Sequence, residues 1–301
     1  MSKAASGPPL DALRGAIDGY LRQLAREVPR LRSEGAGRDV LGPVAGRSEA
    51  EDVEIGLDRF SEDLLQDWLE RSGANVDLYS EHSRRRIGGR GPAPYLITCD
   101  PFDGSGHFMR GLPAEWWGVL TVWERSGDDL TPVMAGAVDI IRRELYKAEG
   151  SAVTVQGLDS GELSEVRPSE AQSLSNDSII AAYLMSPQYI RAWTSRSAGL
   201  LEAMERQYPE ARLWADGGAC SYPWLARGLT HAYVMYDEPR TEIDPGLGFA
   251  SAAGFGVYSV SPDGYLKPYR FEPERSAERV PWLIAACTEA LAQDIVRLVV
   301  L

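Results

Sequence analysis

The chain has 301 residues, of which 44% are hydrophobic, so it is long enough for one large domain or two smaller ones with apolar cores. Its 44 acidic and 31 basic side chains give a formal net charge of -13, which argues against a nucleic acid polymer or an anionic membrane as partner. A phosphate-bearing ligand would also be repelled. Phosphate chemistry on this chain therefore needs local positive charge, most simply bound metal ions.

The cysteine content and the start of the chain bear on where the protein works. Cys99, Cys220 and Cys287 form no CxxC pair and no zinc-ligand spacing, which predicts reduced thiols and a cytoplasmic location. The first thirty residues lack the apolar segment of a signal peptide, and no stretch has 18 uncharged apolar residues. We therefore expect neither export nor a membrane span.

The first half of the chain predicts helices followed by strands. Apolar residues recur at helical spacing from Leu10 to Leu31, which predicts an amphipathic helix with a packing role. Residues 35–47 are rich in glycine and lack periodicity, so we expect a mobile loop there. A second helix is expected over 58–71, ended by Gly73. Strands are then expected at 76–80, 95–99, 117–123, 133–141 and 144–148.

The second half predicts strands and helices in alternation, which is typical of an α/β arrangement. Strands are expected at 179–185, 213–215 and 233–236, and helices at 188–207, 220–227 and 282–299. The change of pattern places a domain boundary near residue 150. We thus expect an α+β domain over 1–150 and an α/β domain over 151–301.

The string that begins at Cys99, Cys-Asp-Pro-Phe-Asp-Gly-Ser-Gly, carries two carboxylates at the end of an expected strand. Proline restricts the residue before it and glycine permits a tight turn, so Asp100, the Phe102 carbonyl and Asp103 can converge on one hard cation. Ligands that are all oxygen favour magnesium or manganese over zinc. Asp-Pro-x-Asp-Gly is also a common turn composition, so other residues must decide between the two interpretations.

This string resembles the central motif of the inositol monophosphatase and fructose-1,6-bisphosphatase superfamily, Asp-Pro-(Ile or Leu)-Asp-Gly-(Thr or Ser). Glu81 precedes Asp100 and resembles the glutamate that the family places before its motif. Asp244 lies in a segment, 243–254, that resembles the family's late Asp-x-x-Ala-Gly helix. Asp58 resembles the family's aspartate that partners the Thr or Ser hydroxyl. Residues 133–150 resemble a hairpin of the family, so the resemblance covers about residues 50–265.

The resemblance implies a layered αβαβα sandwich of the sugar phosphatase type, built from α+β and α/β parts. It also implies magnesium-dependent hydrolysis of a phosphomonoester of a small polyol, a sugar or a related metabolite, with two or three Mg²⁺ ions per active site. The implied metal ligands are Glu81, Asp100, Phe102 through its carbonyl, Asp103 and Asp244. A homodimer is implied as well.

By the same resemblance, Ser105 and Asp58 would orient and deprotonate the attacking water, while the backbone N–H groups of Gly104 and Ser105 hold the phosphate. Further substrate contacts are expected at three positions that also fit ordinary turn chemistry: Gly217, Ala219 and Asp237. A haloacid-dehalogenase-type phosphatase is disfavoured, because its two aspartates lie two positions apart rather than three.

Several positions depart from the family pattern and leave the substrate open. Glu81 is followed by His82, where a second acid is common. Gly106 and His107 depart from the pattern after the central motif, and Ile243 departs from it just before Asp244. They bear on substrate specificity, so the alcohol could be inositol, a hexose bisphosphate, a nucleotide or another metabolite. The alternative function is that of a superfamily relative that binds a sugar phosphate or acts as a scaffold without catalysis.

Overall fold

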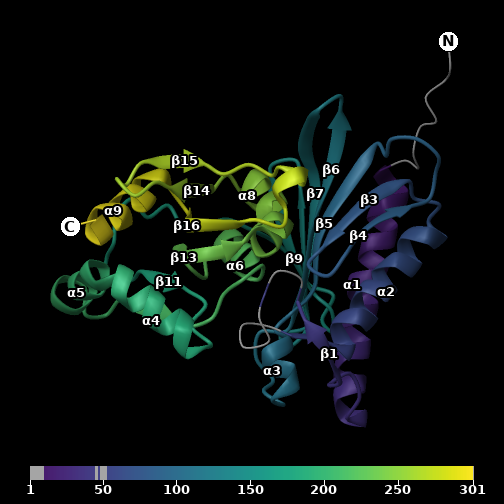
Figure 1. The fold of residues 1–301 in the computed structure, drawn as a ribbon, viewed down its shortest axis with the longest axis horizontal. Helices are drawn as coiled ribbons and strands as arrows, with labels where there is room; N and C mark the ends of the chain where they lie inside the picture. The colour runs from purple at the N-terminus through teal and green to yellow at the C-terminus, as the bar shows by residue number, and fades with distance from the viewer. Residues whose placement is uncertain (1–9, 45–46, 48–52, 301) are drawn as a thin grey trace. The chain divides into compact units, whose positions relative to one another are not determined.

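The computed structural model describes residues 10–44, 47 and 53–300. They form two compact units, which Figure 1 shows as a ribbon. The first unit contains the described residues up to Gly150 and those of 154–164. The second contains 151–153 and continues from Glu165. The sequence places the boundary near 150, whereas the chain returns once to the first unit after that point.

A mixed eight-stranded sheet runs through the first unit in the order β10-β9-β8-β7-β6-β5-β3-β4. Strands β3 and β5 are parallel, while β3–β4, β5–β6, β6–β7 and β7–β8 pair antiparallel. The five strands expected from the sequence in this half are all present. The strands are β3 Val76–Ser80, β4 Arg84–Ile87, β5 Tyr95–Asp103, β6 Trp117–Ser126, β7 Asp129–Asp139, β8 Glu144–Glu149, β9 Ala152–Gly157 and β10 Leu163–Val166.

The first helix, α1 (Leu10–Glu34), packs on this sheet, as its apolar spacing predicts. Two glycines on the sheet make the close approach possible. A Cβ atom on Gly118 would lie 2.7 Å from Leu24 Cδ2, and one on Gly136 would lie 2.9 Å from Leu21 Cδ1. The second helix, α2 (Gly56–Arg71), contacts α1, and its Trp68 ring fills the space beside Gly19.

The glycine-rich segment differs from the expected loop. Part of it forms β1 (Val40–Pro43), which pairs antiparallel with β2 (Val53–Ile55). Val40 is 57% exposed, so β1 buries no apolar face and is held by its backbone pairing with β2. Its sequence therefore lacks the alternation of apolar and polar residues that would predict a strand. Residues 45 and 46 of the same segment lie outside the described residues.

The second unit is built on a six-stranded mixed sheet in the order β12-β11-β13-β16-β14-β15. Its strands are β11 Ile179–Ala181, β12 Arg212–Trp214, β13 Ala232–Pro239, β14 Gly256–Val260, β15 Leu266–Pro268 and β16 Arg279–Ala286. Its helices are α4 Pro187–Arg196, α5 Ala198–Gln207, α6 Ser221–Arg227, α7 Arg240–Ile243, α8 Leu247–Ala253 and α9 Glu289–Val300, with short 3-10 turns η1 Asp244–Gly246 and η2 Pro273–Arg275. A Cβ atom on Gly199 of α5 would lie 2.1 Å from the Leu298 carbonyl oxygen of α9.

Three expectations for this unit are wrong in their extent. The helix expected over 282–299 is strand β16 followed by α9, because the buried run 282–286 is a strand between β13 and β14, and such a run has no period that separates strand from helix. The helix expected over 188–207 is broken at Ser197, whose hydroxyl bonds the buried Tyr236 hydroxyl at 2.9 Å. The strand expected over 179–185 ends at Ala181.

Each unit thus has a mixed sheet with helices against it, which confirms the expected α+β and α/β fold class. None of the helices in the described part of the chain is long and apolar enough to cross a membrane.

Candidate functional site

The candidate site in the first unit begins where β3 and β5 end side by side. The two strands are parallel, and Ser80 of β3 stands opposite Cys99 of β5, so Glu81 and Asp100 follow at neighbouring positions. Carboxylate oxygens of these two residues lie within 4.8 Å of each other. The parallel register therefore brings together two of the predicted metal ligands.

The Asp-Pro-Phe-Asp turn closes around the Asp100 carboxylate. Asp100 is 2% exposed, and its Oδ1 accepts a hydrogen bond of 3.2 Å from the Phe102 amide. The pairing of β5 with β6 is irregular between Asp100 and Asp103, which re-aims the end of the strand. The Pro101 carbonyl accepts a buried hydrogen bond of 3.0 Å from Tyr20 of α1, so the first helix also braces this turn.

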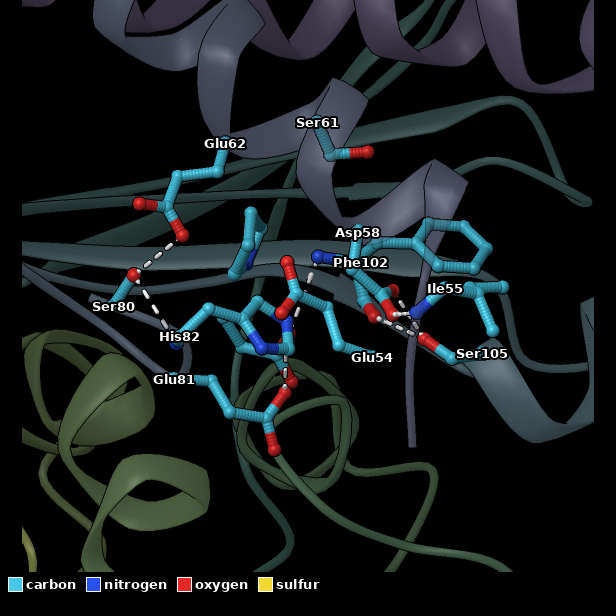
Figure 2. Close-up of polar contacts among 12 residues, drawn as sticks. Glu54, Ile55, Asp58, Ser61, Glu62, Ser80, Glu81, His82, Phe102 and Ser105 are labelled. Carbon is cyan, nitrogen blue, oxygen red and sulfur yellow. Dashed lines mark hydrogen bonds and ion pairs between the residues drawn. The ribbon is translucent and has the colours of Figure 1, made fainter. Parts of the chain in front are cut away.

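Ser105 and Asp58 form a hydrogen-bonded pair, although 47 positions separate them. The Ser105 hydroxyl donates to Asp58 Oδ1 at 2.5 Å, and the Ile55 amide donates to Asp58 Oδ2 at 2.7 Å (Figure 2). Asp58 is 1% exposed. Both carboxylate oxygens are thus fixed, and one of them is held against the serine hydroxyl that the sequence predicts as its partner.

Gly104 is the one residue type that fits the turn between β5 and α3 (Ser105–Met109). Its φ angle is 109°, and a Cβ atom there would lie 2.1 Å from the Glu115 carbonyl oxygen. A side chain at this position would strain the backbone and collide with the chain just before β6. The turn can therefore present backbone N–H groups without a side chain above them.

Glu81 has a partner that the sequence does not reveal. Arg47 Nη2 lies 2.6 Å from Glu81 Oε1, and both side chains are less than 10% exposed. His82 Nε2 lies 3.6 Å from Glu81 Oε2. Burial lowers the pKa of His82, so near pH 7 its imidazole is neutral and Arg47 supplies the positive charge at Glu81. The glycine-rich context of Arg47 gives no signal for this role.

Glu62 is a second residue that the sequence analysis does not single out. It lies on α2, is 2% exposed, and accepts a hydrogen bond of 2.8 Å from the Ser80 hydroxyl (Figure 2). The Ser83 hydroxyl also donates to Glu62. The signal that could find it is its position one helical turn after Asp58, on the same face of α2.

The remaining predicted metal ligand, Asp244, lies in the second unit. Its carboxylate is 2% exposed and accepts a hydrogen bond of 2.7 Å from the Tyr269 hydroxyl. Burial raises the pKa of Asp244 to about 7, although Tyr269 and the nearby Arg240 charge lower it. The apo protein therefore holds this carboxyl only partly ionised at neutral pH.

The predicted substrate contacts of the second unit differ in kind. Ala219 is fully buried and offers only its backbone, while a Cβ atom on Gly217 would lie 2.3 Å from the Tyr233 ring. Asp237 has a φ angle of 54°, and its half-exposed carboxylate lies 3.4 Å from Arg196. Of the three, Asp237 alone presents a polar side chain.

Among the departures from the family pattern, three side chains are internal. His82 has a side chain that is 6% exposed, His107 is 8% exposed, and Ile243 is fully buried. His107 is therefore an internal residue. The Gly106 carbonyl accepts a hydrogen bond of 2.7 Å from Arg110.

The carboxylates of the first unit fit a hard divalent cation. Glu81 and Asp100 place oxygens within 4.8 Å of each other in a buried setting, and their ligand atoms are all oxygen. Arg47 already pairs with Glu81, so a cation bound at Glu81 would have to share this carboxylate with the guanidinium or displace it.

Comparisons with known proteins give structural likeness without sequence matches. A scan against models of protein families finds no match. A search of curated proteins finds none either. Among solved structures, the extragenic suppressor protein suhB of Bartonella henselae is similar with a TM-score of 0.70 at 18% identity, covering 96% of this chain and 98% of that chain.

Two further solved structures give the same likeness. An IMPase of Thermotoga maritima has a TM-score of 0.67 at 18% identity and covers 96% of each chain. An inositol monophosphatase of Zymomonas mobilis has a TM-score of 0.62 at 16% identity, covering 99% of this chain and all of the other. The likeness thus extends over almost the whole length of these proteins.

Proposed function

The chain has the fold of the inositol monophosphatase structures, and from this premise we propose that it is a magnesium-dependent phosphomonoesterase acting on a small polyol, sugar or related metabolite. The fold supports a phosphatase of this superfamily. The residues at the ends of β3 and β5 support the metal and the reaction.

The observation that carries the proposal is the Ser105–Asp58 hydrogen bond, because the two residues meet only through the fold. Ser105 donates a hydrogen bond to Asp58, so its oxygen can accept a proton from a water molecule. That proton would pass to Ser105 Oγ while the serine proton moves to Asp58 Oδ1, and the Ile55 amide keeps the other oxygen in place. The resulting hydroxide attacks phosphorus, the P–O bond to the alcohol breaks, and the alcohol oxygen takes a proton from solvent as it leaves, so no covalent enzyme intermediate forms.

The predicted ligands in the first unit would hold the magnesium: Glu81, Asp100, the Phe102 carbonyl and Asp103. Magnesium supplies the positive charge that a phosphoryl group needs and acidifies water in its vicinity. A protein of net charge -13 otherwise repels its own substrate. We propose Asp244 as a further ligand, and Gly104 and Ser105 as backbone donors to the phosphate.

The substrate contacts in the second unit and the homodimer are part of the same proposal. Asp237 would accept hydrogen bonds from substrate hydroxyls, and Gly217 and Ala219 would contribute backbone atoms. A polyol or sugar suits a carboxylate acceptor, because its hydroxyl groups donate hydrogen bonds.

The direct test is phosphate release from a panel of phosphomonoesters, measured with the purified protein with and without Mg²⁺. We expect turnover with added Mg²⁺ that disappears in EDTA and returns when Mg²⁺ is added in excess. Ser105→Ala serves as the matched inactive variant and excludes a contaminating phosphatase. Full turnover in metal-free buffer would show that the proposed chemistry is wrong.

A non-catalytic sugar-phosphate-binding protein is the second candidate, and the Arg47–Glu81 ion pair favours it. An arginine at this glutamate could replace the metal and bind a phosphate directly. This function predicts substrate binding by calorimetry in EDTA, with no phosphate release under any metal condition.

A further inference from the structure

Helix α2 carries two buried acidic residues one turn apart, and each is bonded to serine hydroxyls from a different strand end. Asp58 accepts from Ser105, which follows β5. Glu62 accepts from Ser80, the last residue of β3, and from Ser83 beyond it. Residues four positions apart lie on the same helix face. Through Asp58 and Glu62, α2 therefore forms hydrogen bonds to residues at the ends of both β5 and β3 (Figure 2).

The second of these contacts defines the turn that carries Glu81. The Ser80 hydroxyl donates to Glu62 and accepts hydrogen bonds from the backbone amides of Ser83 at 2.9 Å and His82 at 3.3 Å. The Ser80 amide in turn donates to the Ser83 carbonyl at 2.9 Å. Glu81 and His82 are thus the two corner residues of a turn whose base is fastened to α2.

The contacts of Glu62 indicate that it holds this turn and does not bind a ligand itself. Its residue is 2% exposed, its two oxygens accept from two serine hydroxyls, and Arg85 Nε lies 3.5 Å from one of them. A buried carboxylate is costly unless its lone pairs are satisfied, and here they are satisfied by the turn. The bonds of Glu62 therefore hold the turn from which the Glu81 side chain extends.

We propose that Glu62 is a positioning residue for Glu81, and that α2 sets the spacing between the Glu81 ligand and the Ser105–Asp58 pair. This inference rests on the proposed function, because it takes Glu81 as a metal ligand. Groups that orient a metal ligand commonly contribute 10–100-fold to metal affinity. The simpler role, a hydrogen bond that only stabilises the fold, makes a different prediction.

The test measures Mn²⁺ binding to the full-length protein by electron paramagnetic resonance, and unfolding temperature in EDTA. Glu62→Gln preserves shape but turns one acceptor into a donor, and we expect about 10–100-fold weaker Mn²⁺ binding. Glu70→Gln is the matched control on the exposed face of the same helix and should bind as wild type. Unchanged Mn²⁺ affinity in folded Glu62→Gln would overturn the inference, even if its unfolding temperature falls.

A second variant keeps the test decisive if Glu62→Gln does not fold. Ser83→Ala removes one of the two serine bonds and leaves the Glu62 charge, so we expect a several-fold loss of Mn²⁺ affinity. In the double variant the loss should be less than the product of the two single losses, because both variants act on one contact. Wild-type affinity in Ser83→Ala, or fully multiplicative losses, would contradict the inference.

The activity pattern separates positioning from catalysis. At saturating Mg²⁺, Glu62→Gln should recover most of its kcat, whereas Ser105→Ala should not. Glu81→Gln distinguishes a failure of the Glu62 inference from a failure of the proposed metal site. If Glu81→Gln loses Mn²⁺ while Glu62→Gln binds normally, the inference alone is wrong. If wild type binds no Mn²⁺, or Glu81→Gln binds it as wild type does, the metal site of the proposed function is wrong as well.

Discussion

Each unit has a buried aspartate, Asp58 in the first and Asp244 in the second, and the two carboxyl groups have different hydrogen-bond donors. Asp58 in the first unit receives a backbone amide on one oxygen and a serine hydroxyl on the other. In the second unit, Asp244 receives the Tyr269 phenol at 2.7 Å, and burial raises its pKa to about 7. Two donors fix the oxygens of Asp58, whereas at Asp244 burial outweighs the donors and favours the protonated form.

This difference matches different chemical roles. A carboxylate that is to take up a proton from Ser105 needs a fixed position, and the two donors to Asp58 supply it. A metal ligand can instead depend on the metal for the charge that compensates its burial, since metal binding displaces the proton. On this view the Asp58 carboxylate is held in position before any ligand binds, whereas Asp244 loses its proton when a metal ion binds.

The largest expected effect tests the first half of that comparison. Ser105→Ala and Asp58→Asn should each lower kcat by about 10²–10⁴, the usual contribution of general-base catalysis, while Mn²⁺ affinity changes little. The double variant should be scarcely worse than either single one, because the two residues act as a unit. Steady-state kinetics at saturating Mg²⁺ measure this. Multiplicative losses would mean that the residues act separately and that another group is the base.

The next effect tests Asp244 through the pH dependence of stability. Its folded pKa of about 7 lies above the ordinary aspartate pKa of 3.8, so the folded state keeps a proton that the unfolded state releases between these values. The metal-free protein therefore loses stability as the pH rises from about 4 to 7. Asp244→Asn cannot ionise, so it should gain on the order of 2 kcal/mol over wild type between pH 5 and pH 8 in EDTA.

Urea unfolding at the two pH values measures this gain. Glu205→Gln, on an exposed glutamate of the same unit, is the control and should show no such gain. In saturating Mg²⁺ the order should reverse, because wild type is stabilised by the bound ion and the variant is not. A pH-independent difference between wild type and Asp244→Asn would show that the carboxyl is ionised throughout.

The sequence predicts the carboxylates of the candidate site better than the residues that contact them. Asp100, Asp103 and Glu81 are recognisable because a strand end, a proline and a glycine leave a fixed pattern, and the structure places Asp58 against Ser105 as expected. Arg47 and Glu62 are missed, because an ion pair and a serine bond between distant segments leave no local periodicity. These contacts depend on how Arg47 and α2 lie against the end of β3, which tertiary packing decides.

The same limit explains the errors in the fold. The run at 282–286 is buried on both faces as a central strand, and its composition alone does not separate that state from a buried helix. The amphipathic α1 is predicted well, because one face meets the sheet and the other meets water. Elements with two different faces are therefore the ones that sequence patterns determine.

The smallest expected effect concerns the single bond from Tyr269 to Asp244. Tyr269→Phe removes the hydroxyl and keeps the ring, which lies under the Arg240 guanidinium at 4.9 Å. Since the phenol lowers the pKa of Asp244, its loss should raise that pKa and cost more stability at pH 8 than at pH 5. We expect a cost of about 1 kcal/mol at pH 5, and a larger one at pH 8, where the hydrogen bond is made to a charge. Tyr265→Phe, at a residue that is 69% exposed, is the control and should be neutral at both pH values. In the Asp244→Asn background the cost of Tyr269→Phe should become independent of pH, because an amide does not titrate. A pH-dependent cost that persists in that background would assign the effect to a different titratable group. The claim that the Tyr269 hydroxyl lowers the pKa of Asp244 would then be wrong.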